Sequence, residues 1–306
     1  MIALNKILFP TDFSECADAA LAWAVLLATK FEAELTLFHA VVLHSDDVGD
    51  EVYSRFPDLD RCIESLMDEA GGRLGNAVPK GGKLVVRQQV RRGIRSSDEI
   101  VGYCAEGAFE LVVMGTYGRR GLSHLLLGSV AERVVRLAPC PVLTVHHDAE
   151  HPADIAELRR VVLPIDFSDP SRLAVRYAVT FARTLGAELE VVHVFERGVH
   201  PSFYSIGRES VFEVDPGLRE RAEEAIGEFM REAGAELPYR SVLLEGKPAA
   251  EIAKLAGSDR NTMVVLASHG AGGLERAMLG STAERVVRLA GCPVLTVKPG
   301  EHDFVS

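Results

Sequence analysis

One stretch of sequence occurs twice in this chain and decides how it folds. The first occurrence reads GSVAERVVRLAPCPVLTV (residues 128–145) and the second reads GSTAERVVRLAGCPVLTV (residues 280–297), so that all but two positions agree. The repeats of solenoid proteins recur every ~20–50 residues, whereas these stretches start 152 residues apart, at 128 and 280. The spacing therefore indicates one domain duplicated in tandem, each copy long enough to form its own core.

The duplication extends toward the start of each copy. ILFPTDFS (residues 7–14) matches VLPIDFS (residues 162–168), which aligns Asp12 with Asp166. The chain has 306 residues, and a single hydrophobic core stops growing near ~250–300 residues. Length and repetition therefore both predict two domains.

A polar segment marks the boundary between the copies. HHDAEHPADIAELRR (residues 146–160) has no clean apolar period before Val161, which is typical of a linker. We place the linker at about residues 147–157. The predicted domains are residues 1–147 and residues 158–306.

Composition limits the classes of protein to which this chain can belong. Hydrophobic residues make up 47% and charged residues 25% of the chain, an ordinary globular balance. Its 33 basic and 44 acidic residues give a formal net charge of −11, which argues against the broad basic face that non-specific nucleic-acid binding requires. An anionic ligand must therefore be held by local groups, such as backbone N–H donors, rather than by overall charge.

The cysteines and the N-terminal residues favour a cytoplasmic protein. The five cysteines form no CxxC pair and are odd in number, so we expect reduced thiols rather than a disulfide framework. Cys140 and Cys292 precede proline in an apolar run, which predicts buried, unreactive thiols. We find no signal-peptide pattern in residues 1–13 and no apolar run long enough to predict a membrane span.

Short apolar runs alternate with helical patterns within each copy. KILFP (residues 6–10) is typical of a buried strand, and Ser14, like Ser168 in the second copy, is suited to cap the helix that follows. Such alternation predicts an α/β fold in which each copy is a five-stranded parallel sheet flanked by helices. We expect the other strands of the first copy at residues 34–42, 83–90, 110–115 and 140–145, and further helices at residues 58–75, 96–107 and 129–138. We expect the arginine-rich residues 90–95 to form a surface loop.

Unusual residues follow the first and the fourth expected strand. In open α/β sheets, ligands bind at the carboxyl ends of the strands where the strand order reverses. The first strand ends in PTD (residues 10–12), whose carboxylate suits a sugar hydroxyl or a base amine. The fourth ends in a G-x2-G-x9-G-S pattern from Gly115 to Ser129. Glycines permit close backbone approach or positive φ, and a Gly-Ser helix start offers N–H groups to a phosphate.

The second copy departs from this pattern. Its fourth strand end reads ASHG (residues 267–270), so that alanine replaces the first glycine. The first copy's two arginines, Arg119 and Arg120, have become Ala271 and Gly272. We expect the alanine to resist positive φ and the second site to carry less positive charge.

These motifs resemble the universal stress protein family in its tandem two-domain form. The resemblance rests on PTDFS after the first strand, on G-x2-G-x9-G-[ST] after the fourth and on the CPVLTV end strand, and it covers nearly the whole chain. It implies the strand order 3-2-1-4-5 in each domain, with ATP between strands one and four. It implies that Mg²⁺ or Mn²⁺ is bound through the phosphates, not by protein side chains. It also implies pairing through the last strands, within the chain or in a homodimer.

The resemblance also implies which residues contact the nucleotide. For the first copy they are Pro10, Thr11, Asp12, Ala40, Met114, Gly115, Gly118, Arg119, Gly128, Ser129 and Val130. For the second copy they are Pro164, Ile165, Asp166, Val194, Leu266, Ala267, Gly270, Gly280, Ser281 and Thr282. The aspartates would meet the base or the ribose, the residue in the second strand would line the adenine, and the later glycines and the helix start would hold phosphates.

Each of these assignments has a plainer alternative. The glycines can form a tight strand-to-helix turn with an ordinary cap, and Asp12 and Asp166 can cap the helix that follows each of them. His39 and His193 recur in the second strand of each copy. Packed, hydrogen-bonded side chains account for them better than catalysis does.

The sequence favours a nucleotide-binding protein over an enzyme. Phosphoanhydride hydrolysis needs a group that activates water or a metal placed for in-line attack, and no second carboxylate or GxxxxGK[ST] motif accompanies the glycine pattern. The leading hypothesis is a cytoplasmic ATP-binding stress-response protein whose nucleotide occupancy regulates its conformation or its partners. The alternatives are a slow ATP hydrolase and a dimerising scaffold with one or both nucleotide sites vestigial. Neither nucleic acid nor a membrane is an expected partner.

Overall fold

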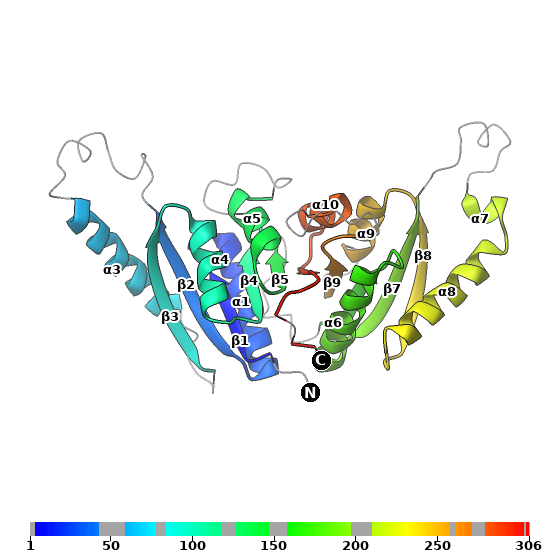
Figure 1. The fold of residues 1–306 in the computed structure, drawn as a ribbon, viewed down its shortest axis with the longest axis horizontal. Coiled ribbons are helices and arrows are strands. Elements are labelled where there is room, and N and C mark those ends of the chain that lie inside the picture. Colours follow the sequence, from blue (N-terminus) through cyan, green and yellow to red (C-terminus); the bar gives the residue numbers. More distant parts are fainter. Residues whose placement is uncertain are drawn as a thin grey trace. The chain divides into compact units, whose positions relative to one another are not determined.

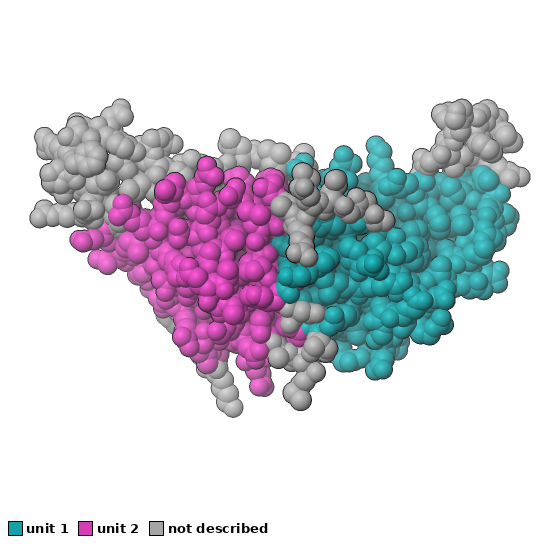
Figure 2. Space-filling model, in the orientation of Figure 1, with its two compact units in different colours: residues 1–2, 148–301, 305–306 teal, residues 3–147, 302–304 magenta. Residues whose placement is uncertain are grey.

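The computed structural model contains two compact units, drawn in magenta and teal in Figure 2. The unit of residues 3–147 and 302–304 holds the first copy, and the unit of residues 148–301, 1–2 and 305–306 holds the second. The structure describes residues 4–42, 59–77, 84–117, 127–146, 158–196, 210–257, 261–270, 279–302 and 304–305. Within these residues, no helix has the length and apolar character that crossing a membrane requires.

Each copy forms a five-stranded parallel sheet (Figure 1). The strands of the first copy are β1 (Lys6–Pro10), β2 (Glu34–Val42), β3 (Val86–Gly93), β4 (Leu111–Gly115) and β5 (Val142–Val145), in the order β3-β2-β1-β4-β5. Those of the second copy are β6 (Arg160–Pro164), β7 (Glu188–Phe195), β8 (Tyr239–Glu245), β9 (Thr262–Ala267) and β10 (Val294–Val297), in the order β8-β7-β6-β9-β10. Both orders equal 3-2-1-4-5, which confirms the predicted α/β fold.

Helices flank both sheets (Figure 1). Those described in the first copy are α1 (Glu15–Phe31), α3 (Leu59–Ala77), α4 (Ser96–Glu106) and α5 (Ser129–Leu137). Those described in the second are α6 (Asp169–Leu185), α7 (Val211–Val214), α8 (Leu218–Glu232), α9 (Pro248–Ala256) and α10 (Ser281–Leu289). The successive β1 residues Ile7, Leu8 and Phe9 are at most 1% exposed. Because neighbouring side chains of a strand point to opposite faces, this central strand is covered on both faces.

The first helix of each copy begins where the sequence predicts. Ser14 Oγ accepts a hydrogen bond from the Ala17 N–H at 3.3 Å, and Ser168 Oγ accepts one from the Ser171 N–H at 3.4 Å. Each bond satisfies one of the N–H groups that a helix start leaves without an intrahelical acceptor. The serines therefore fix the point at which the chain leaves the first strand and enters the helix.

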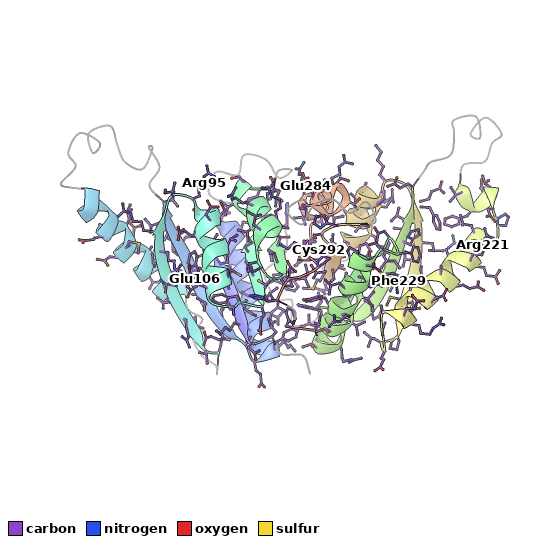
Figure 3. All side chains as sticks on the ribbon, viewed as in Figure 1. Arg95, Glu106, Arg221, Phe229, Glu284 and Cys292 are labelled. Carbon is purple, nitrogen blue, oxygen red and sulfur yellow. The ribbon has the colours of Figure 1, made fainter. Side chains whose placement is uncertain are left out.

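Strand β3 runs further than the sequence predicts. The expected loop at residues 90–95 was wrong for residues 91–93, which continue the predicted strand as part of β3 and pair with β2 as far as Val42. The nine-residue β2 offers backbone partners along this length, and the guanidinium of Arg91 reaches the carboxylate of Glu106 at 2.6 Å. Glu106, labelled in Figure 3, lies at the end of α4. The neighbouring strand, rather than apolar alternation, therefore decides where β3 ends.

Candidate functional site

The two unusual strand ends of each copy lie side by side in the structure. β1 pairs with β4 in the first copy, and β6 pairs with β9 in the second. The strand order proceeds in opposite directions from each of these pairs, so each pair is the topological switch point of its sheet. The structure thus brings the residues that follow the first strand next to those that follow the fourth, as the sequence predicts.

A phenylalanine in the left-handed region shapes the turn after the first strand. Phe13 and its counterpart Phe167 both have φ of 63°, a conformation that costs a non-glycine residue ~1–2 kcal/mol. In the first copy, the Phe13 N–H donates to Thr11 Oγ1 at 2.9 Å, and the Ser14 N–H donates to Asp12 Oδ1 at 3.1 Å. Such strain is often found at functional sites. Here the hydrogen-bonded turn around Phe13 holds the Asp12 carboxylate at the carboxyl end of β1.

A histidine in the second strand supports each of these turns. His39 Nδ1 is 2.7 Å from the carbonyl oxygen of Thr11, and His193 Nδ1 is 3.0 Å from that of Ile165. Because a carbonyl oxygen can only accept, Nδ1 carries the proton in both copies. The phenylalanine of each turn packs on this histidine, with ring centroids 4.7 and 4.8 Å apart. The histidines are therefore packed and hydrogen-bonded, as predicted.

In each copy, a glycine at the start of α5 or α10 is hydrogen-bonded to the residue that follows the fourth strand. The Gly128 N–H donates to the carbonyl oxygen of Thr116 at 2.8 Å, and the Gly280 N–H donates to that of Ser268 at 2.7 Å. A Cβ on either glycine would lie 3.0 Å from that same oxygen. Both glycines have φ of −61°. Glycine is therefore required at both positions because two backbone segments approach closely there, and not because the backbone has a positive φ.

The helix that starts at this glycine presents uncapped N–H groups. Gly128 and Gly280 occupy the N-cap positions of α5 and α10, and neither helix start has a side-chain cap in the described part of the chain. The first N–H groups of a helix have no intrahelical acceptor, and they sit at the positive end of its dipole. Residues 129–130 and 281–282 are exposed or half-buried. Their N–H groups can therefore serve an anion.

Packing against the first helix explains the glycine that ends β4. A Cβ on Gly115 would lie 2.8 Å from Cys16 Sγ and 3.0 Å from the Cys16 carbonyl oxygen. Gly115 is not among the glycines of positive φ. The second copy carries Pro170 and Ala267 at the aligned positions. Ala267 is not among the residues of positive φ either, so the replacement of glycine by alanine requires no left-handed backbone there.

The remaining predicted residues differ in burial and in their distance along the sheet from these strand ends. Met114 and Leu266 are each 5% exposed, so they belong to the core beneath the site. Ala40 and Val194 are half-buried on β2 and β7, the strands next to β1 and β6. Outside the described residues lie Gly118 and Arg119.

One close approach connects the aspartate with the glycine pattern in the second copy. A Cβ on Gly270 would lie 2.3 Å from Asp166 Oδ2, so any larger residue there would displace the carboxylate. The residues that follow β6 and those that follow β9 therefore meet at this point. The structure brings the two segments into contact, and the ligand that the sequence pattern predicts they share stays a prediction.

Two serine hydroxyls hold the aspartate of the second copy. Ser171 Oγ donates to Asp166 Oδ1 at 2.6 Å, and Ser168 Oγ donates to the same oxygen. The first copy has Ala17 at the position of Ser171, so it lacks one of these hydroxyls. This difference is visible in the aligned residues, although it belongs to neither of the motifs that predict the site. In the second copy, two hydroxyls of the helix start therefore bind the aspartate carboxylate.

The residue after the fourth strand carries different chemistry in the two copies. The Tyr117 hydroxyl is 3.1 Å from His146 Nε2, and the second copy has His269 and Lys298 at these positions. His269 Nδ1 is 2.7 Å from Ser268 Oγ. Partial burial, followed by the charge of Lys298, lowers the pKa of His269. The second copy thus has basic side chains at this strand end that are not among the predicted site residues.

Comparison with known proteins finds similarity to the universal stress protein family along nearly the whole chain. The model of the universal stress protein family matches residues 3–146 and again residues 157–298. A universal stress protein of Mycobacterium tuberculosis is 30% identical over 302 residues, covering 94% of this chain and 95% of its own. One of Mycolicibacterium smegmatis is 28% identical over 298 residues, covering 96% of this chain and 97% of its own.

Solved structures agree in fold. A universal stress protein from Archaeoglobus fulgidus has a TM-score of 0.64 at 23% identity, covering 97% of this chain and 99% of its own. A functionally unknown protein from Pseudomonas aeruginosa has a TM-score of 0.65 at 20% identity, covering 97% of this chain and 94% of its own. With two matches to the family model and relatives of the same length, this chain belongs to the universal stress protein family and contains two copies of its domain.

Proposed function

We propose that this chain is a cytoplasmic stress-response protein that binds ATP at the switch point of each sheet. The observation that carries the proposal is the glycine contact made in both copies, Gly128 to Thr116 and Gly280 to Ser268. It holds an uncapped helix start next to the aspartate turn of the first strand. Membership of the family supports the same reading.

The chemical groups of the site suit the parts of ATP. The N–H groups of residues 129–130 donate to phosphate oxygens, which a chain of net charge −11 cannot attract by overall charge. The Asp12 carboxylate accepts from a ribose hydroxyl or from the base amine. The half-buried Ala40 lines the adenine. Mg²⁺ or Mn²⁺ accompanies the nucleotide through its phosphates and offsets their charge.

Nucleotide occupancy would regulate the protein by joining two segments. The aspartate turn and the start of α5 belong to separate parts of the chain, at Asp12 and Gly128, and a ligand that contacts both stabilises one arrangement of them. We assign residues 1–147 and 158–306 to the two domains. The last strand of each copy, β5 or β10, is the proposed surface through which copies pair, within one chain or between two.

A second candidate function is a scaffold whose second site is vestigial. The hydroxyls of Ser168 and Ser171 on Asp166 favour it, because a ligand hydroxyl must compete with them for the same carboxylate. In that case ATP binds in the first copy alone, and the second copy contributes to pairing.

Nucleotide counting distinguishes these functions. Purified protein is denatured, and the released nucleotide is identified and quantified by chromatography. About two ATP per chain supports two working sites, and about one supports the scaffold with a vestigial second site. The Gly128→Val and Gly280→Val variants assign each nucleotide to its copy. Gly291→Ala is the control, because Gly291 has no neighbouring atom within 4 Å of an added Cβ.

Two further results would change the proposal. No released nucleotide, together with no thermal shift on adding ATP and Mg²⁺, would contradict ATP binding. Steady phosphate release from ATP, abolished by Ser129→Ala, would instead favour the slow hydrolase. The ATP-binding function predicts that added ATP is recovered unhydrolysed.

A further inference from the structure

Two buried thiols touch each other in the first copy, away from the candidate nucleotide site. Cys104 lies in α4, and Cys140 lies in the turn between α5 and β5. Their sulfur atoms are 3.3 Å apart, although the residues are 36 positions apart in sequence. Both side chains are 0% exposed. The sequence predicts a buried, unreactive Cys140, and the structure adds a second thiol in contact with it.

We propose that Cys104 and Cys140 form an oxidisable dithiol, which hydroperoxides convert to a disulfide within the first copy. The thiolate of one residue attacks a peroxide oxygen, so that the O–O bond breaks and a sulfenic acid and hydroxide form. The second sulfur then attacks the sulfenic sulfur, and the S–O bond breaks as water leaves with the second thiol's proton. In total, two thiols lose two electrons and two protons, and one hydrogen peroxide becomes two waters.

The geometry requires little movement for this bond to form. A disulfide has a sulfur–sulfur distance near ~2.05 Å, so the two sulfurs must approach by about 1.3 Å. Helix α4 is tied to α5 by the Arg133–Asp98 ion pair at 2.8 Å. Helix α4, which carries Cys104, is therefore held against the helix that precedes Cys140 in the chain.

Burial determines the rate of the reaction. An oxidant reaches a fully buried sulfur only when the structure opens locally. Cys140 lies between Pro139 and Pro141 in a turn outside the helices and strands, so this turn is the element that must open. We therefore expect slow oxidation, whose rate rises in denaturant concentrations too low to unfold the protein.

The second copy provides an internal control. Ala256 in α9 stands at the position of Cys104, and Cys292 stands at that of Cys140. Burial raises the pKa of the Cys292 thiol to about 12, and Cys292 is labelled in Figure 3. Among the described residues, only the first copy therefore has two thiols in contact. Because alanine is already present at this place in the second copy, the Cys104→Ala variant should fold.

The test is oxidation of the full-length folded protein with hydrogen peroxide, followed by alkylation and peptide mass spectrometry without reduction. We expect a peptide that joins Cys104 to Cys140, with the loss of two hydrogens, restored by dithiothreitol. The Cys104→Ala variant should lose this product. The Ala256→Cys variant should gain a second linked peptide, to Cys292. The oxidised protein should melt roughly 5–10 °C higher, because a disulfide restricts the unfolded chain.

Several outcomes would overturn the proposal. Cys104 and Cys140 could remain fully alkylatable after prolonged peroxide treatment of the folded protein. Either residue could accumulate as sulfinic or sulfonic acid without a linked peptide. The linked peptide could also appear only in samples unfolded before oxidation. Each of these results would show that the contact is ordinary core packing.

Discussion

Replacing Gly128 by alanine tests whether the glycine contact holds the helix start in position. An added Cβ would lie 3.0 Å from the carbonyl oxygen of Thr116, a backbone atom that cannot rotate away. The start of α5 must therefore move by a few tenths of an ångström, and the 2.8 Å hydrogen bond from the Gly128 N–H must lengthen. Overpacking and the weakened bond together should lower the free energy of unfolding by ~1–2 kcal/mol.

Gly128→Ala should reduce the free energy of ATP binding by more than it reduces the free energy of unfolding. The displaced N–H groups of residues 129–130 would lose alignment with the phosphates, and a hydrogen bond to a charged group contributes ~1.5–3 kcal/mol. Loss of one such bond weakens the affinity of the first copy by ~10–100-fold. Isothermal titration calorimetry measures the affinity, and urea unfolding measures the stability.

Two glycines serve as controls for this variant. Gly280→Ala produces the same displacement in the second copy and should leave the affinity of the first unchanged. Gly291→Ala adds a Cβ in open space and should change neither quantity. If Gly128→Ala lost stability while ATP affinity stayed within about twofold of the parent protein, the glycine would be a structural turn only, and the reasoning would be refuted.

Three further predictions concern single side chains. Asp12→Ala should weaken ATP binding ~10-fold by calorimetry, because a charged acceptor is removed; an unchanged affinity would exclude ligand contact. Arg160→Ala should lower the free energy of unfolding by ~3 kcal/mol, because it removes the closer and more buried of the two arginines that pair with the buried Glu190, at 3.2 Å, whereas the exposed Arg240→Ala should cost under ~1 kcal/mol. Because the pKa of His269 is lowered on folding, the unfolded chain binds more protons, so stability should fall as pH drops below ~6.5. His269→Gln should flatten that part of the urea-unfolding profile, and an unaltered profile would contradict the assignment.

Much of the fold could be predicted because local pattern and global structure agree. Alternating apolar runs and helical periods predict parallel strands with crossovers, and Ser14 and Ser168 mark the helix starts that the structure confirms. The exact length of β3 could not be predicted, because its last residues pair with β2 despite their arginines. The point at which β3 ends depends on backbone pairing with the neighbouring strand, and the local sequence carries no information about that pairing.

The site could be placed from the sequence more readily than it could be explained. The aspartate and glycine motifs predict which strand ends meet, and the structure brings them together. The left-handed Phe13 was not predicted, since φ there depends on Thr11 and on packing against His39. For Gly115 the pattern left close backbone approach and positive φ both open, and only the contact with Cys16 of a different element decides between them. Contacts between elements set these features, so only the folded chain shows them.

The comparison of ATP with adenosine tests the central claim most directly, since the two ligands differ only in the phosphates. If the helix starts of α5 and α10 hold those phosphates, nucleotide-free protein should bind ATP at least ~30-fold more tightly than adenosine, a difference of ~2 kcal/mol. Gly128→Ala should reduce that ratio for the first copy. Equal dissociation constants for ATP and adenosine would contradict the account.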